Sequence, residues 1–448
     1  MYSKFGQFID GKWQEAEKKE TYEVINPATE EVIGKASKAS SVDVDKALKS
    51  AEKGLKVWRN TAPWQRSYII RKIADLMREK KDVLAKWLTL EVGKPLAEGV
   101  GEVGGAADIF EWNAEETKRI YGQTVESRFP DSRVHVYYQP VGVVAALVPW
   151  NFPIVLASRK ISTALAAGCS VICKPDVITP GAVMELVDIC REAGVPPGVV
   201  NLLSGDPAGI SEQLIKSDIV KKISVTGSTR VGKLILKQAA DKVQRVTMEL
   251  SGHSPFIVFD DADINKATDI AVTAKFRNNG QVCISPNRFY IQEKKKDDFI
   301  NSFISKAKKL KIGNGMDENV QLGPLTTEKR LSEVEQLVET TKKEGAKVLM
   351  GGKRPAGFNK GYFYEPTVFD DVKDDFTIMK EEPFGPLVPM LSFKNFDEVI
   401  ERANKNDLGL CSYICTNSMD QAHRASELME TGTVAVNTGV VALAEAPF

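Results

Sequence analysis

The chain has 448 residues, which is enough for more than one domain with a sizeable hydrophobic core. Lysine plus arginine and aspartate plus glutamate both number 60, so the formal net charge is zero, which argues against nucleic acid or an anionic membrane surface as the main partner. Six cysteines without a Cys-x-x-Cys pair give no disulfide framework, and three scattered histidines are too few for a His-built metal site.

Neither a signal peptide nor a membrane span is expected. The N-terminal segment interrupts its apolar residues with Lys4 and Asp10. The least polar run, Val141 to Ala157, contains Pro149 and Pro153 and is followed closely by two basic residues, so it is a poor candidate for crossing a bilayer. A cytoplasmic protein is therefore the expectation.

The N-terminal part, up to about residue 140, is predicted to form strands followed by helices. Phe8 to Trp13 contains an Asp-Gly pair, which is typical of a hairpin turn. Apolar residues at helical spacing follow, and the last of these helical patterns stops at Gly93-Lys94-Pro95. No chemistry is assigned to this part of the chain.

From Val141 onward, short apolar runs alternate with amphipathic helical patterns. The strands expected in the first series are 143–148, 170–174, 199–203, 223–226 and 246–249. A second series begins near residue 256, and its later strands are expected at 288–292, 347–350, 387–393, 411–415 and 433–436. Such alternation implies parallel sheets covered by helices, with ligands at the carboxyl ends of the strands. The sequence thus predicts two α/β domains joined near residue 251.

Glycine motifs give only a partial nucleotide-binding signal. No G-x-G-x-x-G occurs, and Gly227-Ser228-Thr229-Arg230-Val231-Gly232-Lys233-Leu234 has leucine where a Walker loop needs Ser or Thr for magnesium, which argues against a nucleoside triphosphatase. The same segment can still bind a pyrophosphate through backbone N–H groups at a helix start, or it can be an ordinary capped helix. Spacing alone does not decide between these readings.

One cysteine differs from the rest. Cys283 lies in a polar, glycine-containing loop, Phe276 to Phe289, between a helical and a strand pattern. The other five cysteines belong to apolar strands or a helix and are expected in the core: Cys169, Cys173, Cys190, Cys411 and Cys415. Loops on a rigid α/β scaffold often carry catalysis, but no histidine is near in sequence, so the residues alone leave Cys283 open between nucleophile and bystander.

Several separated segments match one family, in order and with fitting spacing, over essentially the whole chain. They are Pro149-Trp150-Asn151-Phe152-Pro153, Lys174-Pro175, Gly227-Ser228-Thr229, Met248-Glu249-Leu250-Ser251-Gly252, Phe276 to Cys283, and Glu382-Pro383-Phe384-Gly385-Pro386. Each is weak alone, but together they resemble the NAD(P)-dependent aldehyde dehydrogenase superfamily, and most of all its succinate-semialdehyde dehydrogenase branch.

The resemblance implies an α/β fold with two Rossmann-like doubly wound domains and a small oligomerisation β-flap. The implied parts are an NAD(P)-binding domain at 1–121 and 141–251, a catalytic domain at 252–436, and an oligomerisation segment at 122–140 and 437–448. Relatives continue through a further strand beyond Phe448, so the C-terminal part is expected to be truncated. Val134, Val136 and Tyr138 alternate as in an exposed strand, and a homodimer or homotetramer is expected.

The resemblance also implies catalytic roles. Cys283 would be the nucleophile that attacks the aldehyde carbon. The side-chain amide of Asn151 would help the Cys283 backbone N–H hold the oxyanion, and Glu249 would be the general base for the water that hydrolyses the thioester. Taken singly, Glu249 could equally be a solvated charge at a strand end and Asn151 a turn residue.

The cofactor is expected to be NAD or NADP. Lys174 and Glu382 would hold the two riboses, and Gly227 and Ser228 the pyrophosphate. The cofactor cleft would further include Trp150, Asn151, Leu250 and Phe384. Val177 stands where many NAD-preferring relatives place a carboxylate on the adenine ribose, so NADP is expected to be at least tolerated, although Asp176 lies next to it.

The implied substrate is a small carboxylated semialdehyde such as succinate semialdehyde. Arg159 and Arg277 match positions where arginines grip a distal carboxylate, a pairing that guanidinium groups form in a two-pronged geometry. Two residues depart from the branch: Ala442 replaces a serine for the same carboxylate, and Ser285 replaces a second cysteine that some members use for redox control.

Other functions stay open at this stage. Glutarate or oxoglutarate semialdehyde and simple aldehydes are alternative substrates. A CoA-acylating aldehyde dehydrogenase is a further alternative, against which Glu249 argues, and a non-catalytic binding homologue is another. Apart from a small-molecule aldehyde and further copies of the chain, no partner is expected.

Overall fold

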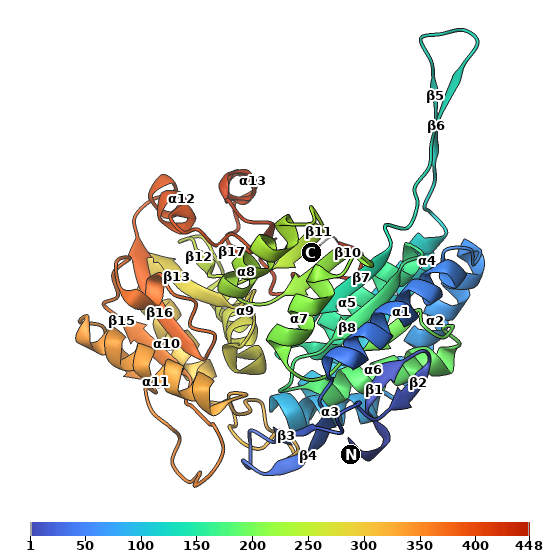
Figure 1. Ribbon diagram of the computed structural model, residues 1–448. Coiled ribbons are helices and arrows are strands. Elements are labelled where there is room, and N and C mark those ends of the chain that lie inside the picture. Colours follow the sequence, from blue (N-terminus) through green and yellow to red (C-terminus); the bar gives the residue numbers. More distant parts are fainter. Residues whose placement is uncertain (1, 447) are drawn as a thin grey trace. The chain divides into compact units, whose positions relative to one another are not determined.

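The computed structural model describes residues 2–446 and 448. Contacts divide the chain into two compact units (Figure 1). Unit 1 comprises Met1–Ile25, Val32–Leu88 and Gly99–Glu249, and unit 2 comprises Asn26–Glu31, Thr89–Glu98 and Leu250–Phe448. The short segments Asn26–Glu31 and Thr89–Glu98 thus cluster with unit 2, although the sequence pattern grouped them with the N-terminal domain.

In the described residues, unit 1 contains a seven-stranded sheet with the order β11-β10-β7-β8-β9-β1-β2. Its strands are β1 (Gln7–Ile9), β2 (Lys12–Gln14), β7 (Val143–Leu147), β8 (Ser170–Lys174), β9 (Val200–Leu202), β10 (Val220–Thr226) and β11 (Arg245–Glu249). The strands from β7 to β11 are parallel, and β1 pairs antiparallel with both β9 and β2. The chain runs from β7 outward to β9 and then crosses to β10 on the other side, so β7 and β10 flank a topological switch point.

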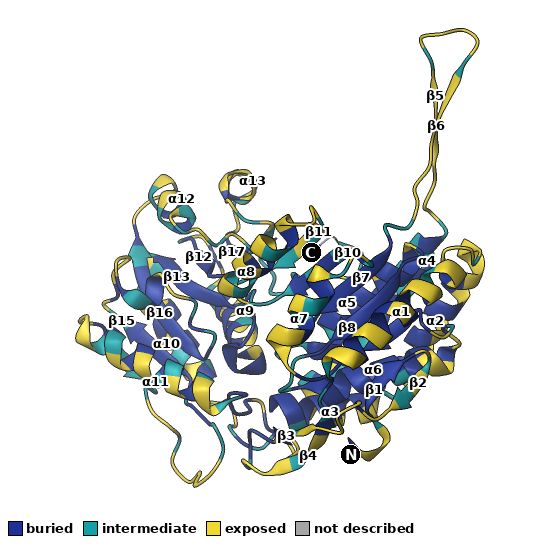
Figure 2. Ribbon diagram, viewed as in Figure 1, coloured by how far each residue is buried: buried dark blue, intermediate teal, exposed yellow. Residues whose placement is uncertain are grey.

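Helices cover both faces of this sheet, which explains why its central strands are apolar on both sides. Six of the helices of unit 1 are α1 (Ser41–Trp58), α2 (Pro63–Glu79), α5 (Pro153–Ala166), α6 (Pro180–Ala193), α7 (Pro207–Lys216) and α8 (Thr229–Ala240). One group consists of α1, α7 and α8, and the other of α2, α5 and α6. Every residue of β7 and β8 is buried, as the dark strands of Figure 2 show.

Proline and glycine mark several helix ends in this unit. Helices α5, α6 and α7 all have proline in the first turn, where its missing N–H costs nothing. Helix α6 ends at Gly194, whose φ of 99° is the left-handed conformation that glycine adopts without steric cost. Local sequence therefore sets where these helices begin and end.

Helix α4 (Leu96–Thr117) follows α3 (Lys81–Val92) and was not expected from the sequence. It contains four glycines, each of which disfavours a helix by about 1 kcal/mol. Ion pairs to α2 compensate, since Arg71 binds Glu111 at 2.6 Å and also Glu115, while Arg78 binds Asp108 at 2.7 Å. Tertiary packing thus overrides weak propensity in α4.

Two separate two-stranded ribbons also occur in the chain. One pairs β3 (Thr21–Ile25) with β4 (Val32–Ser37). The other pairs β5 (Gln123–Glu126) with β6 (Arg133–Val136), and all of its residues are exposed. Figure 1 shows the β5–β6 ribbon extending away from the helices and sheet of unit 1.

Unit 2 contains, in the described part of the chain, a second seven-stranded sheet with the order β14-β15-β16-β13-β12-β17-β18. Its strands are β12 (Ser254–Val258), β13 (Pro286–Gln292), β14 (Lys347–Met350), β15 (Thr367–Asp370), β16 (Leu387–Phe393), β17 (Cys411–Cys415) and β18 (Thr433–Val436). Only the β14–β15 pairing is antiparallel among the pairings between these strands.

The helices of unit 2 are α9 (Ile264–Phe276), α10 (Lys296–Ala307), α11 (Glu328–Lys343), α12 (Phe396–Asn404) and α13 (Met419–Leu428). Short 3-10 helices complete the described chain: η1 (Tyr2–Lys4), η2 (Arg277–Gly280), η3 (Glu293–Lys295) and η4 (Thr377–Met379). Phe256 of β12 stacks with Phe289 of β13 and Tyr413 of β17, so aromatic rings tie the central strands together. Of the helices described, none combines the length and apolar character needed to cross a membrane.

Candidate active site

The predicted residues of unit 1 lie at the carboxyl ends of neighbouring strands in the order β11-β10-β7-β8. Trp150 and Asn151 follow β7, Lys174 ends β8, Gly227 and Ser228 follow β10, and Glu249 ends β11. Because parallel strands end at one edge of the sheet, these residues share the edge at which the strand order reverses. The predicted site residues of unit 1 therefore lie at the carboxyl ends of neighbouring parallel strands, where the alternation of strands and helices leads us to expect a ligand.

Asn151 is only 5% exposed and sits in the turn between β7 and α5. The backbone N–H groups of Ile154 and Val155, at the start of α5, donate to Oε1 of Glu102 at 3.1 and 3.3 Å. A buried carboxylate at a helix N-terminus is stabilised by the helix dipole and satisfies the free N–H groups there. Glu102 therefore fixes the helix start next to Asn151.

Glu249 is half-buried, and burial raises the pKa of its carboxyl group, while Lys160 and Arg159 act to lower it. Lys160, on α5, donates from Nζ to Oγ1 of Thr226 at 2.8 Å. Burial lowers the pKa of Lys160 to about 8, with Glu249 opposing that shift. Since Thr226 pairs with Glu249 in the β10–β11 register, a cation and a partly desolvated carboxylate share this strand edge.

Lys174, at 4% exposure, is one of the few buried lysines. Burial lowers its pKa, whereas Asp176 and Asp206 act to raise it. The carboxylate of Asp176 accepts from the backbone N–H of Ile178 at 3.0 Å. Val177, between them, is half-buried and carries no polar side chain.

The start of α8 has room for an anion. Ser228 is the N-cap, and its Oγ accepts from the Val231 N–H at 3.4 Å. A Cβ added to Gly227 would meet nothing within 4 Å, so the backbone is open on that side. Exposed N–H groups and the positive end of the helix dipole favour a phosphate here, and so the residues present fit the pyrophosphate of a dinucleotide.

The predicted residues of unit 2 lie at the amino ends of parallel strands, whereas those of unit 1 lie at carboxyl ends. Leu250 precedes β12, Cys283 precedes β13, and Glu382 and Phe384 precede β16, and these three strands are parallel neighbours. The rule that ligands lie at carboxyl strand ends thus describes unit 1 but not unit 2. The reason is chain direction, since the cysteine loop joins the end of α9 to the amino end of β13.

Cys283 is half-buried, whereas the other five cysteines are buried, which confirms the prediction that these five belong to the core. Burial raises the thiol pKa of Cys173, Cys411 and Cys415 to about 12. Such thiols carry almost no thiolate at neutral pH and are poor nucleophiles.

The loop before Cys283 has an unusual backbone. Asn278, Asn279 and Gly280 have φ values of 47°, 56° and 74°, so three consecutive residues are left-handed. Each non-glycine residue in that conformation costs on the order of 1 kcal/mol, which the surroundings must offset. This run turns the chain sharply between the end of α9 and Cys283.

Hydrogen bonds within unit 2 hold the loop in this shape. The Asn278 N–H donates to Oε2 of Glu98 at 2.8 Å, and Asn279 Nδ2 donates to the Gly323 carbonyl at 3.0 Å. Buried Gln281 donates to the Asn278 carbonyl at 3.0 Å and accepts from the Thr326 N–H at 2.9 Å. Beyond the cysteine, the Tyr413 hydroxyl donates to the Ile284 carbonyl at 2.7 Å.

Two glycines allow close backbone packing around this loop. A Cβ added to Gly252 would lie 2.0 Å from the Cys283 carbonyl oxygen. A Cβ added to Gly280 would lie 2.2 Å from the Gly385 carbonyl oxygen. Two of the motifs quoted above, 248–252 and 382–386, therefore include residues that approach the cysteine loop within contact distance.

Glu382 accepts from the Gly252 N–H at 3.2 Å. Burial raises the pKa of this carboxyl group to about 7, and the nearby Arg330 and Lys275 act in the opposite direction. The guanidinium of Arg330 also lies 5.9 Å from the centre of the Phe384 ring.

The two predicted substrate arginines belong to different elements. Arg159 is half-buried on α5, the helix that follows Asn151. Arg277 is exposed at the first position of η2, six residues before Cys283. Arg277 and Cys283 both influence the ionisation of Tyr413, whose pKa is raised mainly by burial.

Sequence reasoning missed several residues that hold the site. Glu98, Glu102 and Lys160 were not singled out, because each resembles an ordinary surface charge in the sequence. Gln281 and Tyr413 carry no spacing signal either, since their partners are distant in the chain. Glu98 and Glu102 are four residues apart on α4, a helix that the sequence pattern did not predict.

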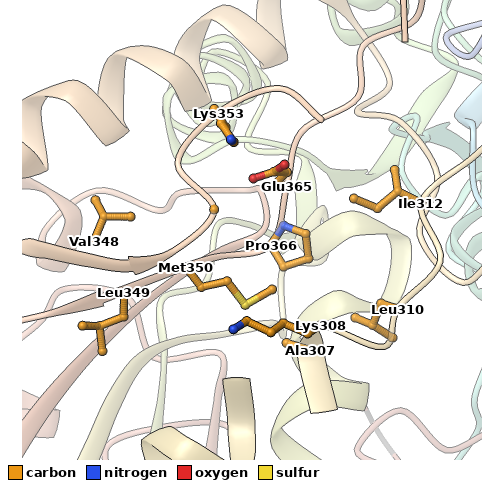
Figure 3. Close-up of a pocket in the computed structure, with 11 residues that line it drawn as sticks. Ala307, Lys308, Leu310, Ile312, Val348, Leu349, Met350, Lys353, Glu365 and Pro366 are labelled. Atoms are coloured by element: carbon orange, nitrogen blue, oxygen red, sulfur yellow. The ribbon is translucent and has the colours of Figure 1, made fainter. Parts of the chain in front are cut away.

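A further cavity of about 500 Å³ on unit 2 shares no residue with this site (Figure 3). It lies beside β14 at the edge of the sheet, and Figure 3 shows Lys308, Lys353 and Glu365 around apolar Met350 and Pro366. None of the predicted site residues lines it.

Comparison with known proteins identifies the family of the chain. The family model for the aldehyde dehydrogenase family matches residues 13–448. The chain belongs to the aldehyde dehydrogenase family. This confirms the resemblance read from the motifs, and the enzyme is an NAD(P)-dependent oxidoreductase.

Individual relatives agree along almost the full length of this aldehyde dehydrogenase. Glutarate-semialdehyde dehydrogenase of Pseudomonas putida is 42% identical over 441 residues, covering 98% of this chain and 91% of the relative. Succinate-semialdehyde dehydrogenase [NADP(+)] of Escherichia coli is 41% identical over 440 residues, with 98% and 91% covered. A crystal structure of an E. coli NADP-dependent enzyme aligns with a TM-score of 0.98 at 40% identity, covering 100% of this chain and 93% of that one. The predicted α/β aldehyde dehydrogenase fold is confirmed.

Replacing Gly252 by alanine tests the packing around the cysteine loop. The added methyl group meets the Cys283 carbonyl oxygen, so Gly252→Ala is expected to lower the rate of aldehyde oxidation by about 100-fold, the size of effect caused by small misplacements at a reacting centre. NAD(P)H absorbance gives the rate, and thermal unfolding shows whether the variant is folded.

Gly104→Ala is the matched control. Gly104 lies inside α4 with nothing within 4 Å of the added Cβ, so this change should keep activity and stabilise the helix by up to about 1 kcal/mol. Full activity in folded Gly252→Ala would contradict the packing argument.

Proposed function

We propose that this enzyme oxidises a small aldehyde with a carboxylate at its far end, such as succinate semialdehyde, to the corresponding acid. The observation that carries the proposal is the pair of arginines: Arg159 lies on α5, the helix that follows Asn151, and Arg277 lies on η2, six residues before Cys283. A guanidinium group recognises a carboxylate with two parallel hydrogen bonds, which gives both affinity and orientation. Similarity to a glutarate- and a succinate-semialdehyde dehydrogenase supports this substrate class.

The first step is the attack of the Cys283 thiolate on the aldehyde carbon, forming a C–S bond and an oxyanion. The Cys283 backbone N–H and the Asn151 side-chain amide donate hydrogen bonds to that oxyanion. Donors fixed in advance stabilise the developing charge without reorganisation. The fixed loop of unit 2 and the Glu102-anchored turn of unit 1 supply such rigidity.

NAD(P)+ would supply the hydride acceptor for this oxidation, after which the acyl group would remain on Cys283 as a thioester. Lys174 and Glu382 would hold the two riboses through hydrogen bonds. Gly227 and Ser228 at the start of α8 would hold the pyrophosphate, with Trp150, Leu250 and Phe384 as apolar neighbours. Val177 neither bonds an adenine-ribose diol nor repels a 2′-phosphate, which supports acceptance of NADP.

Glu249 then acts as general base for the water that hydrolyses the thioester. Burial raises the pKa of this carboxyl group, which makes its carboxylate a stronger base than an ordinary one. The positive charge of Lys160 at this strand edge favours the ionised form of Glu249. The presence of this base supports hydrolysis to the free acid rather than acyl transfer to CoA.

We further propose that the enzyme is a homodimer or homotetramer in the cytoplasm. The β5–β6 ribbon is exposed along its whole length, and an isolated two-stranded ribbon is only marginally stable in water. Val125 and Val134 pair across its strands, and Phe129 and Tyr137 nearby are also exposed. Association between copies of the chain would cover this apolar surface.

The arginine variants test the substrate. Arg159→Ala and Arg277→Ala should each lower kcat/KM for succinate and glutarate semialdehyde by about 10- to 100-fold, the worth of a charged hydrogen bond. Oxidation of butanal and pentanal, which have no carboxylate, should change little. The measurement is initial NAD(P)H formation with each substrate.

Arg424→Ala, an exposed arginine on α13, serves as control and should behave as the wild type with every substrate. Equal kcat/KM values for carboxylated substrates in the wild type and in both site variants would refute the assignment.

A Glu249→Gln variant tests the hydrolytic step. It should release about one equivalent of NAD(P)H per site rapidly and then turn over some 100- to 10,000-fold more slowly, because the thioester lacks its base. In the wild type, kcat should fall on the acid side with an apparent pKa above that of an ordinary carboxyl group. The reason is that the folded-state pKa of Glu249 is raised, and its base form is lost as pH falls through that pKa. Unimpaired steady turnover in the variant would assign the base elsewhere.

The ribbon is tested by Val134→Asp, which places a charge on its exposed face. The mass measured in solution by light scattering should fall from that of an oligomer toward the 49.3 kDa of a single chain. An unchanged oligomer would show that the ribbon does not form the interface.

A further inference from the structure

Lys275 is a buried charged residue for which the proposed mechanism has no role. It lies in the last turn of α9, next to Phe276, and its side chain is fully buried at 0% exposure. Its Nζ donates to Oδ1 of Asn287, which is also fully buried, at 2.7 Å. Burying a lysine costs far more than burying an apolar side chain of similar size, so a core position for it calls for a specific function.

The position of this bond in the chain is informative. Lys275 is the last residue but one of α9, the helix before the cysteine loop, and Asn287 is the second residue of β13, the strand after it. The bond therefore joins the two residues that flank the segment 276–286, which includes both Arg277 and Cys283. Asn287 Nδ2 and Ser285 Oγ are buried without a hydrogen-bond partner among the described residues, so Lys275 supplies the polar side-chain contact of Asn287.

The loop needs such a tie because its backbone is strained. Asn278 and Asn279 are left-handed, and the contacts of Gln281 and Tyr413 hold the loop at points on either side of Cys283. Those contacts fix the middle of the loop but not its two ends. The Lys275–Asn287 bond fixes the ends relative to each other.

We infer that Lys275 is a positioning residue: bonded to Asn287, it holds the ends of the cysteine loop together and so sets where Cys283 presents its thiol and backbone N–H. This rests on the proposed role of Cys283 as nucleophile. Lys275 acts through Asn287 and the loop backbone and does not touch the substrate.

The tie does not depend on the protonation of Lys275. Burial lowers the pKa of this amino group to about 7, and the carboxylate of Glu382 opposes that shift. Both the ammonium and the neutral amine have an N–H to donate to Asn287 Oδ1. The hydrogen bond from Lys275 to Asn287 therefore persists as pH rises through neutrality.

The test uses Lys275→Met, which keeps the length and apolar stem of the side chain, and Asn287→Leu, which removes the acceptor. Each should lower both kcat and the rate of Cys283 alkylation by iodoacetamide about 10-fold or more, with KM for NADP within about twofold of the wild type. The double variant should be no worse than the single ones, because both remove the same bond. Lys266→Met, an exposed lysine in the first turn of α9, is the matched control and should change neither rate.

Thiol alkylation distinguishes positioning from a merely structural role. Replacing both members of a buried polar pair by apolar residues is often neutral or stabilising, so the Tm of the double variant should stay level or rise while its thiol reactivity falls. Each single variant leaves one buried polar group without its partner and should have a lower Tm. Folded Lys275→Met with unchanged kcat and unchanged alkylation overturns the inference. If Lys275→Met does not fold, Asn287→Asp decides, since it keeps an acceptor for Lys275: rates within about twofold of the wild type support the tie, and a tenfold loss overturns it.

Cys283→Ala separates this inference from the function on which it rests. It should abolish aldehyde oxidation and remove the alkylation signal. Activity retained in Cys283→Ala refutes the nucleophile itself. Activity lost in Cys283→Ala, together with a fully active Lys275→Met, refutes only the role of Lys275.

Discussion

The fixed backbone of the loop before Cys283 is the constraint on which the site depends. Three consecutive left-handed residues, Asn278, Asn279 and Gly280, turn the chain from α9 toward β13, and this conformation is unfavourable by itself. Polar contacts from Glu98, Gln281 and other residues of unit 2 offset its cost. Glycine is needed at positions 252 and 280, in two separate sequence motifs, because the backbone of Cys283 or of Gly385 passes too close for a side chain. The strain and the motifs thus have one physical cause.

Buried charges form the second theme of the structure. Glu102 satisfies the start of α5, Lys160 bonds Thr226 beside Glu249, and Lys275 bonds Asn287. Each burial has an unfavourable desolvation cost, and burial lowers the pKa of Lys160 and of Lys275. In return each side chain makes a hydrogen bond next to a segment that carries a catalytic candidate. Stability is exchanged here for fixed geometry, as is common at active sites.

Much of this enzyme was predictable because its signals are local. Alternating apolar runs gave both sheets, Gly93-Lys94-Pro95 marked the end of a helix, and the polar surroundings of Cys283 separated it from five core cysteines. Helix α4 was missed because its glycines weaken the helical signal, while the ion pairs from Arg71 and Arg78 that stabilise it come from a distant helix. Glu98 and Glu102 were missed with it.

The sequence by itself determined the class of the protein, its two α/β units and the residue types able to perform thiol chemistry with a dinucleotide. Those features follow from short-range periodicity and from motifs a few residues long. Only the tertiary structure decided which strand ends carry the site, because strand order and direction depend on pairings between distant segments. It also decided that Lys160 and Lys275 are buried polar contacts and that half-buried Glu98 bonds the cysteine loop, since burial and partners distant in the chain leave no mark on the local sequence.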